Sequence, residues 1–454
     1  MTEHIQVLSL PLTSAQLEFW CAACEVEPPS ARSFASEYIE IHGPISTHLF
    51  QQALTHVVED SETLRVSFVD TVDGPRQMVY TASPHWELPF LDLTSDPDPK
   101  GAAIAWMEHT LARPLELSKW PQFTFALFKI TDNRFFWFQS YPHIMMDGFG
   151  LMLIAKRVAE IYTSLAADET PGAHDFKPLR VLVEEDEKYR ASGRSSIDQG
   201  RWREHYADKP SSITLAGKPL LPSRDNMQDL RRTVYLSPGD TDNLMAIVKN
   251  TIKVTLAQFI SAATVAYVSR MTRKTNIITL GLVSMVRTTS KERRVPGMAA
   301  NILPFRLSVL QSMSITELSR QAATELALIK QIQRYRGGDL GGELSSLKNK
   351  QGVFGMEVNV MCFDYDLHFY GYSSTTHNIA AGTTDDIMIN VSDRRDGCGL
   401  RIDFDGSPQY YTIDDLDKHQ TSFLKLLMCA ADFPDTPLED LDFILPQMRE
   451  KLTT

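Results

Sequence analysis

The feature that most constrains the fold of this chain is a strand that is apolar on both faces. A short joint and then an apolar helix follow it directly. The stretch FFWFQSY (135–141) predicts a strand in the middle of a sheet, because its apolar side chains point to both sides. Pro142 cannot donate to a sheet ladder and so ends the strand. Gly148 permits a sharp turn into the helix that follows. His143 and Asp147 therefore fall in a joint between two buried segments.

The rest of the chain alternates between strand-like and helical patterns, which predicts a helix-flanked mixed α/β fold. We expect strands over 36–43, 63–70, 75–82, 121–130, 133–140, 231–237, 276–284, 300–310, 354–365, 387–395 and 399–406, and helices over 13–25, 45–62, 101–117, 151–167, 182–192, 199–208, 240–250, 254–268, 314–333 and 413–431. The segment 168–178 is rich in Pro, Gly and acids and is the best linker candidate. We therefore expect an N-terminal lobe over 1–175, carrying His143, and a C-terminal lobe over 176–454 whose last residues form a linker.

The net charge and the lengths of the apolar segments exclude some classes of protein. The 454 residues carry a formal net charge of -12, which argues against a nucleic-acid partner and suits a cytoplasmic protein. The N-terminus lacks the charged start and apolar core of a signal peptide. The longest apolar segment, 254–268, is shorter than a membrane span requires, so we interpret it as a core helix with no membrane partner.

Five cysteines are scattered along the chain, which does not indicate a disulfide framework. Cys21 and Cys24 form a C-x-x-C, but no second pair lies nearby to complete a zinc site. We interpret both as packed helix cysteines and predict no metal site.

His143 is the strongest candidate for chemistry. A neutral imidazole can take a proton near pH 7, and general-base help of this kind is worth roughly 100- to 10,000-fold. Asp147 would need a cation or several donors in a buried joint. From the residues alone, a satisfied core histidine is an equally weighted alternative. The chain contains no G-x-S-x-G elbow, P-loop, G-x-G-x-x-G or H-E-x-x-H motif.

Several ordered motifs resemble those of condensation domains of nonribosomal peptide synthetases. PHIMMDGFG (142–150) resembles their H-H-x-x-x-D-G motif, and LPLTSAQLEFW (10–20) resembles their first motif. ETLRVSF (62–68), MVRTTS with GMAANILPFRL (285–307), and VNVMCFDYDL (358–367) resemble further motifs in the family's order. The resemblance covers nearly the whole chain.

This resemblance implies two chloramphenicol-acetyltransferase-like lobes in a V, with the active site along a central tunnel. It implies an acyltransferase that forms an amide bond between a carrier-bound acyl thioester donor and the amine of an aminoacyl acceptor. The domain itself would bind no cofactor, and the phosphopantetheine arms of donor and acceptor carrier proteins would deliver the substrates. An adjacent adenylation domain is a further expected partner, because 438–454 resembles the linker that leads into one.

The family's site residues carry over to matching positions. His143 would be the catalytic histidine, Asp147 and Arg287 would form a structural ion pair, and Gly148 would keep the turn open. Asn359 and Pro142 are expected to line the substrate tunnel. Asn359 matches a tunnel asparagine of the family, and Pro142 stands where the family has its first histidine. We expect that proline to stiffen the loop and leave activity intact. Two motif residues, Arg65 and Trp20, are expected to be structural.

The resemblance also favours some reactions and substrates over others. His143 argues against heterocyclization, and the first and N-x-L-P motifs favour condensation over epimerization. The closest likeness is to siderophore-type domains that accept an aryl acid such as dihydroxybenzoate. The first motif lies close behind Met1, which suits an initiating domain or a free-standing amide synthase. Two other functions stay open: an acyltransferase that uses coenzyme A or a free amine, and a non-catalytic carrier-docking module.

Overall fold

The computed structural model describes residues 6–25, 34–83, 85–207, 214–218, 229–272, 276–344, 354–381 and 384–442. The chain forms two compact units. The first unit combines residues 1–192 with the segments 285–300 and 363–382, and the second combines 193–284, 301–362 and 383–454. The boundary expected near residue 175 treats the lobes as consecutive stretches and leaves out the two returning segments.

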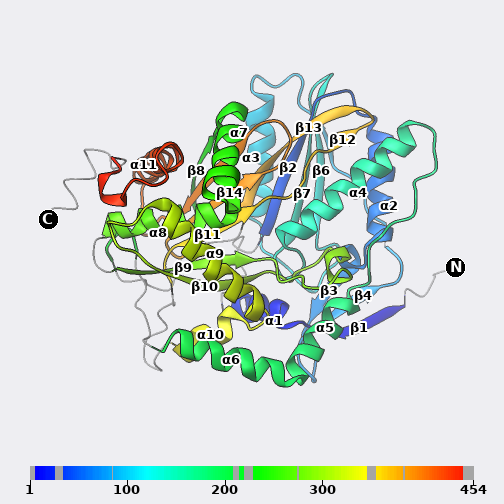
Figure 1. The fold of residues 1–454 in the computed structure, drawn as a ribbon. Coiled ribbons are helices and arrows are strands. Elements are labelled where there is room, and N and C mark those ends of the chain that lie inside the picture. Colours follow the sequence, from blue (N-terminus) through cyan, green and yellow to red (C-terminus); the bar gives the residue numbers. More distant parts are fainter. Residues whose placement is uncertain are drawn as a thin grey trace. The chain divides into compact units, whose positions relative to one another are not determined.

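The first unit contains a six-stranded and a three-stranded sheet (Figure 1). The six-stranded sheet has the order β12-β13-β2-β7-β6-β5, and the smaller one has the order β1-β4-β3. The strands are β1 (Val7–Pro11), β2 (Phe34–Ile41), β3 (Val66–Val69), β4 (Arg76–Tyr80), β5 (Phe90–Asp92), β6 (Thr124–Thr131), β7 (Arg134–Pro142), β12 (His368–Phe369) and β13 (Tyr372–Ala381). The helices are α1 (Ser14–Glu25), α2 (Thr47–Asp60), η2 (Glu62–Arg65), α3 (Pro99–Leu111), α4 (Gly148–Ala166), α5 (Arg180–Ala191) and η4 (Glu292–Arg294).

Strand β7 lies in the middle of its sheet, between β2 and β6, as its apolar pattern predicts. Phe135 and Trp137 pack in the cluster that contains the apolar faces of α2 and α4. Phe136 and Phe138 pack on the opposite side with α3. Helices therefore cover both faces, and the residue that follows β7 is placed by a strand that is buried from Phe135 to Pro142.

The second unit contains another six-stranded sheet, of order β10-β9-β11-β14-β15-β8. Its strands are β8 (Leu230–Tyr235), β9 (Ile277–Ser284), β10 (Asn301–Ser308), β11 (Glu357–Met361), β14 (Ile387–Asp393) and β15 (Leu400–Gly406). Its helices are α6 (Gly193–His205), α7 (Pro238–Ile247), η3 (Val248–Ile252), α8 (Leu256–Thr272), α9 (Ile315–Ile332), α10 (Gly337–Leu344), α11 (Ile413–Asp432) and η5 (Leu438–Asp440). Parallel and antiparallel pairs occur in both six-stranded sheets, so the predicted pair of mixed sheets is confirmed.

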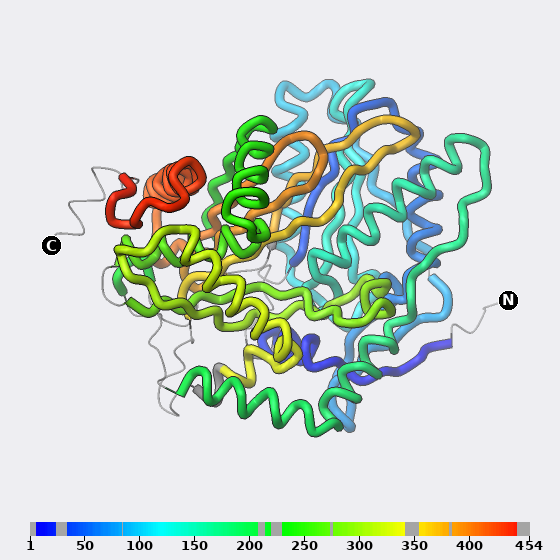
Figure 2. Tube along the Cα trace, viewed as in Figure 1, coloured from blue at the N-terminus to red at the C-terminus, as the bar shows by residue number. Residues whose placement is uncertain are grey.

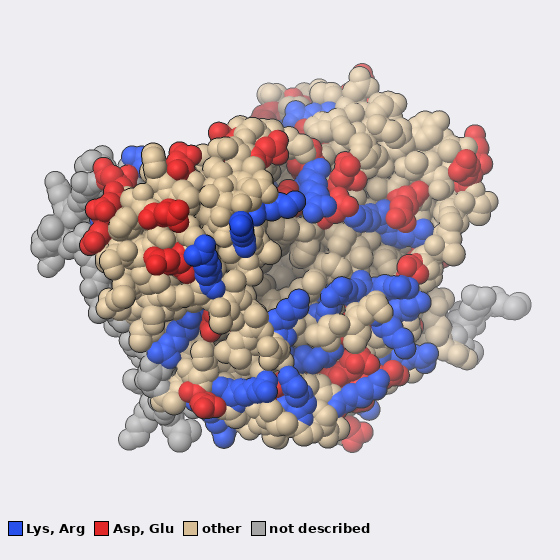
Figure 3. All heavy atoms as spheres, viewed as in Figure 1, with Lys and Arg blue, Asp and Glu red and all other residues tan. Residues whose placement is uncertain are grey.

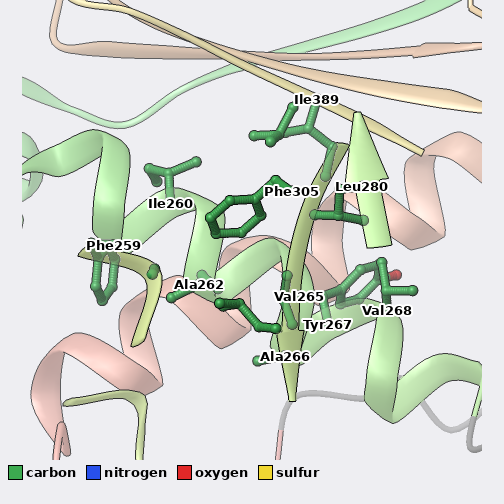
Figure 4. Close-up of a cluster of buried hydrophobic side chains, with 14 of the residues drawn as sticks. Phe259, Ile260, Ala262, Val265, Ala266, Tyr267, Val268, Leu280, Phe305 and Ile389 are labelled. Carbon is green, nitrogen blue, oxygen red and sulfur yellow. The ribbon is translucent and has the colours of Figure 1, made fainter. Parts of the chain in front are cut away.

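Helix α8 is the centre of the second unit's core. Figure 4 shows its side chains meeting Leu280, Phe305 and Ile389 from three strands. Ala262 and Ala266 are small and buried within this core, which agrees with the core helix predicted here. Within the described residues, no single helix combines the length and apolarity of a membrane span. Helices 238–252 and 256–272 meet that test only as a pair, bent by 92°.

Strand β13 is the main element that the sequence patterns did not predict. It returns from late in the chain to pair antiparallel with β2, as the orange-yellow and blue segments of Figure 2 show. Its Ser, Thr, His and Asn side chains hide the alternation by which strands are recognised. Strand β13 thus completes the first unit's sheet by backbone pairing.

Segment 168–178 joins α4 to α5 inside the first unit. Helix α5 carries exposed charges of both signs, among them Arg180, Glu184 and Lys188. Figure 3 shows such a mixture of Lys, Arg, Asp and Glu side chains across the face drawn. Mixed signs are typical of a solvent-exposed helix face.

The cysteines whose side chains the structure describes form no disulfide. Cys21 on α1 is exposed and not packed as expected, because it points away from the face that α1 buries. The side chain of Cys24 lies outside the described residues.

Candidate active site

The joint after β7 is a short turn that is held by the backbone. The amides of Met145 and Met146 both donate to the carbonyl oxygen of Pro142, at 2.9 and 3.2 Å. Asp147 is then the N-cap of α4, and its Oδ1 accepts from the amide of Gly150 at 3.0 Å. The turn is therefore fixed at both ends, by the buried strand and by the capped helix.

The imidazole of His143 has one nitrogen committed to the turn. Its Nδ1 lies 3.1 Å from the carbonyl oxygen of Met146. Because a carbonyl oxygen can only accept, Nδ1 carries the hydrogen and the lone pair is on Nε2. The residue His143 is half-buried, so solvent reaches part of it. The geometry suits a general base.

Asp147 is buried and forms the expected ion pair with Arg287. The carboxylate Oδ2 lies 2.7 Å from Nη1 of Arg287 and also accepts from the amides of Ala299 and Ala300, at 3.0 and 3.1 Å. Both partners are at least 95% buried. These contacts use the carboxylate within the protein, so Asp147 holds the joint in shape.

Arg287 ties the joint to the returning segment 285–300. Its Nη2 donates to the carbonyl oxygen of Gly297 at 2.7 Å, and the amide of Asp147 donates to the same oxygen at 3.3 Å. The guanidinium lies 5.0 Å above the ring of Phe149, a cation–π distance. The ion pair thus links the start of α4 to a segment far away in the sequence.

Two glycines occupy the start of α4. Gly148, which we expected to keep the turn open, is the first residue of the helix. Gly150 has a clear packing reason to be glycine. A Cβ atom there would lie 2.3 Å from the sulfur of Met146 and 3.0 Å from the amide nitrogen of Gly297. The close approach of segment 285–300 therefore depends on position 150.

A buried polar chain lies beside the end of β7. Tyr141 donates to Gln139 at 2.8 Å, and Gln139 and Tyr365 both donate to Oε1 of Glu37, at 2.8 and 3.0 Å. Burial raises the pKa of Tyr141 well above its ordinary value. Tyr141 therefore stays a neutral donor near pH 7 and does not compete with His143 as a base.

The remaining expected site residues fall in different places. Pro142 is the last residue of β7 and accepts the two turn amides. Asn359 lies on β11 of the second unit, where its side chain donates to Asn390 at 3.0 Å and Asn390 donates to Asp405 at 2.8 Å. Asn359 is therefore one member of a hydrogen-bonded row of polar side chains on this sheet.

Arg65 and Trp20 have the structural contacts expected of them. The guanidinium of Arg65 donates to the carbonyl oxygens of Val58 and Tyr80, at 2.6 and 3.0 Å, and so closes the end of α2. Trp20 packs against the core of the first unit. Across the described residues, no group of three or more His, Cys, Asp or Glu side chains is placed to hold a metal ion.

One neighbour of His143 was not predicted. The ring of Phe19 on α1 stacks on the imidazole, with centroids 5.5 Å apart and an angle of 21° between the planes. Phe19 lies inside the first motif, but nothing in the local pattern relates that motif to the joint. Only the tertiary fold brings the two rings together.

Comparison with known proteins identifies a family. A model of the condensation domain matches residues 8–453. The dimodular nonribosomal peptide synthase of Bacillus subtilis is 39% identical over 445 residues, which cover 98% of this chain and 18% of that protein. The isonitrile lipopeptide synthase of Streptomyces coeruleorubidus is 38% identical over 433 residues, covering 95% of this chain and 29% of that protein. The chain thus spans less than a third of either relative.

A solved structure matches at similar identity. A variant of the starter condensation domain of rhizomide synthetase, in complex with C8-CoA, is 37% identical with a TM-score of 0.88. The match covers 96% of this chain and 98% of that one.

Proposed function

The chain belongs to the condensation-domain family, whose members form amide bonds on a chloramphenicol-acetyltransferase-like fold, and we propose that His143 is its catalytic base. In the proposed reaction, a carrier-bound acyl thioester is the donor and the amine of an aminoacyl group is the acceptor. The product is an amide and a free thiol.

The acceptor nitrogen attacks the thioester carbonyl carbon, a C–N bond forms, and Nε2 of His143 takes the proton that the nitrogen releases. The tetrahedral intermediate then collapses, the C–S bond breaks, and the imidazolium returns the proton to the leaving thiolate. General-base help contributes roughly 100- to 10,000-fold, and holding the two reactants together can contribute more.

The observation that supports this role is the fixed tautomer of His143. The bond from Nδ1 to the Met146 carbonyl assigns the lone pair to Nε2. The turn that presents this nitrogen is held by Asp147 and Arg287 through an ion pair of 2.7 Å. A histidine that only filled a core would not need a buried ion pair to hold its backbone.

We infer that the donor is a medium-chain acyl group. Two similar proteins support this donor. A starter condensation domain in complex with C8-CoA is 37% identical to this chain, and an isonitrile lipopeptide synthase is 38% identical. An aryl acid, which the sequence resemblance suggested, is the competing donor. Carrier proteins with phosphopantetheine arms and an adjacent adenylation domain are the proposed partners, and the cytoplasm is the proposed location.

Mass spectrometry of the products tests this proposal. The chain is mixed with an aminoacyl acceptor carrier and with octanoyl or dihydroxybenzoyl groups, each supplied on a carrier and, separately, on coenzyme A. We expect octanoyl amide from the carrier-bound donor. Product from acyl-coenzyme A alone would instead identify a coenzyme A-dependent acyltransferase. Carrier binding without product from any donor would identify a docking module.

A further inference from the structure

In the part of the chain that the structure describes, a hydrogen bond and a ring contact both restrain the imidazole of His143. The Nδ1–H of an imidazole lies in the plane of the ring, so its hydrogen bond to the carbonyl oxygen of Met146 limits rotation of His143 about the Cβ–Cγ bond. The ring of Phe19 lies nearly parallel to the imidazole at 5.5 Å and limits tilting out of that plane. Together they determine where Nε2 points, and the turn alone would supply only the first restraint.

We propose that Phe19 is a positioning residue for amide formation, which holds His143 in line and stabilises its imidazolium form. This inference rests on the proposed role of His143 as the base. When Nε2 takes a proton, the ring becomes a cation that faces the negative π-cloud of Phe19. Such cation–π contacts are favourable, most of all where water is partly excluded. Phe19 and His143 are both half-buried, so the contact is only partly screened.

Helix α1 is anchored well enough to hold Phe19 in place. Thr13 and Gln16 form reciprocal bonds at its start: the amide of Thr13 donates to Oε1 of Gln16 at 3.0 Å, and the amide of Gln16 donates to Oγ1 of Thr13 at 3.2 Å. This is a capping box, which sequence TSAQ encodes. Gln16 also bonds the side chain of Gln77 at 3.1 Å. The first turn of α1 is therefore fixed to β4, one turn before Phe19.

A second anchor comes from α5. The Oδ2 atom of Asp186 accepts from both the amide and the hydroxyl of Ser14, each at 3.0 Å. Arg190 pairs with the same carboxylate at 3.1 Å. Because α1 is held from two sides, the Phe19 ring serves as a stable wall for the imidazole.

The test compares Phe19→Leu with Phe19→Tyr. Leucine keeps an apolar side chain and removes the π-face, whereas tyrosine keeps the face. Phe90→Leu is the matched control. It makes the same substitution at an exposed position, on strand β5 of the same unit. Two quantities are measured: the single-turnover rate of amide formation across pH at saturating substrates, and the titration of His143 by NMR with labelled histidine.

We expect the rate with Phe19→Leu to fall about tenfold, which corresponds to about 1.4 kcal/mol. KM should change little, because Phe19 acts on the imidazole. The acid limb of the pH–rate profile and the NMR titration of His143 should both move to lower pH, since the imidazolium loses its stabilising face. Phe19→Tyr should match the wild type on both measures.

A Phe19→Leu variant that behaves like Phe90→Leu in rate and titration would overturn the inference. So would a rate loss with an unmoved titration, since that would show packing alone. If Phe19→Leu does not fold, Phe19→Met replaces it with a flexible side chain of similar volume. The NMR titration needs no turnover. An inactive wild type would therefore refute the proposed function, while the contact between the two rings is still tested.

Discussion

At the scale of single residues, the ion pair between Asp147 and Arg287 is the feature on which the shape of the joint depends. Both charges are buried, and the carboxylate has three other donors within the protein. A buried pair of this kind adds little net stability over an apolar pair, but breaking it leaves one charge uncompensated. The pair therefore acts as a constraint on geometry.

Replacing Asp147 with Asn should destabilise the protein by about 3–5 kcal/mol, because Arg287 stays charged and buried. Denaturant unfolding measures this change. Asp175→Asn is the matched control, because Asp175 is 82% exposed and pairs with Arg294 at 3.4 Å. Its loss should cost less than about 1 kcal/mol. Equal effects of the two substitutions would contradict the constraint that we assign to Asp147.

The sequence predicts only part of this residue-scale picture. His143 and Asp147 stand out locally, because polar residues are unexpected between two apolar segments. Arg287 entered through the family resemblance, since nothing near it in the chain points to Asp147. Phe19 was missed, because stacking between distant residues leaves no local pattern. Contacts between residues far apart in the sequence cannot be predicted from the local pattern of side chains.

At the scale of elements, the start of α1 is held partly by a neighbouring helix, α5. Asp186→Ala removes the α5 carboxylate that accepts from the amide and hydroxyl of Ser14. We expect a loss of about 1 kcal/mol, typical of a lost N-cap contact. Hydrogen exchange at the first turn of α1 should become faster in proportion. Glu187→Ala, an exposed neighbour on α5, is the control. Unchanged exchange in Asp186→Ala would show that α1 does not need this anchor.

Element prediction succeeded where apolar side chains form a clear run and failed where the sequence is polar or rich in glycine. Helix α8 and strand β7 were placed well, because burial demands continuous apolar residues. Strand β13 was missed because it is polar, and α10 because its sequence GGDLGGEL is rich in glycine. Part of the range 63–70 that was expected as a strand is the short helix η2, in which Arg65 bonds back to α2.

At the scale of the whole molecule, the two units should respond to pH in opposite ways. In the first unit, burial alone would raise the pKa of Glu40, but hydrogen bonds from His377 and Arg134 lower it to about 2. In the second unit, burial raises the pKa of Glu357 to about 8 and that of Asp386 to about 7. A lowered carboxyl pKa stabilises the fold above its unfolded value, and a raised one destabilises the fold as the carboxyl ionises.

The second unit should therefore lose stability as pH rises from about 4.5 to about 8. Glu357→Gln, which removes one of these carboxyls, should leave the melting temperature little changed at pH 5. At pH 9 it should raise stability by on the order of 2 kcal/mol or more, since each pKa unit corresponds to about 1.4 kcal/mol. Thermal unfolding followed across pH checks this. A wild type and variant with parallel pH profiles would show that Glu357 ionises normally.

The first unit should show the reverse dependence. The stability that Glu40 contributes is fully present above about pH 4.5 and is lost as pH falls through about 2. Acid should therefore weaken the sheet that leads into the joint, whereas the second unit loses stability as pH rises from about 4.5 to about 8.

We propose above all that Nε2 of His143 carries the proton in amide formation. The most direct test is the single-turnover rate of amide formation by the wild type and by His143→Ala, at equal melting temperature and with saturating donor and acceptor. We predict that the rate falls by at least about 100-fold in the variant, the lower limit of general-base help. Equal rates would contradict the claim, because positioning by the rest of the domain would then account for catalysis without this histidine.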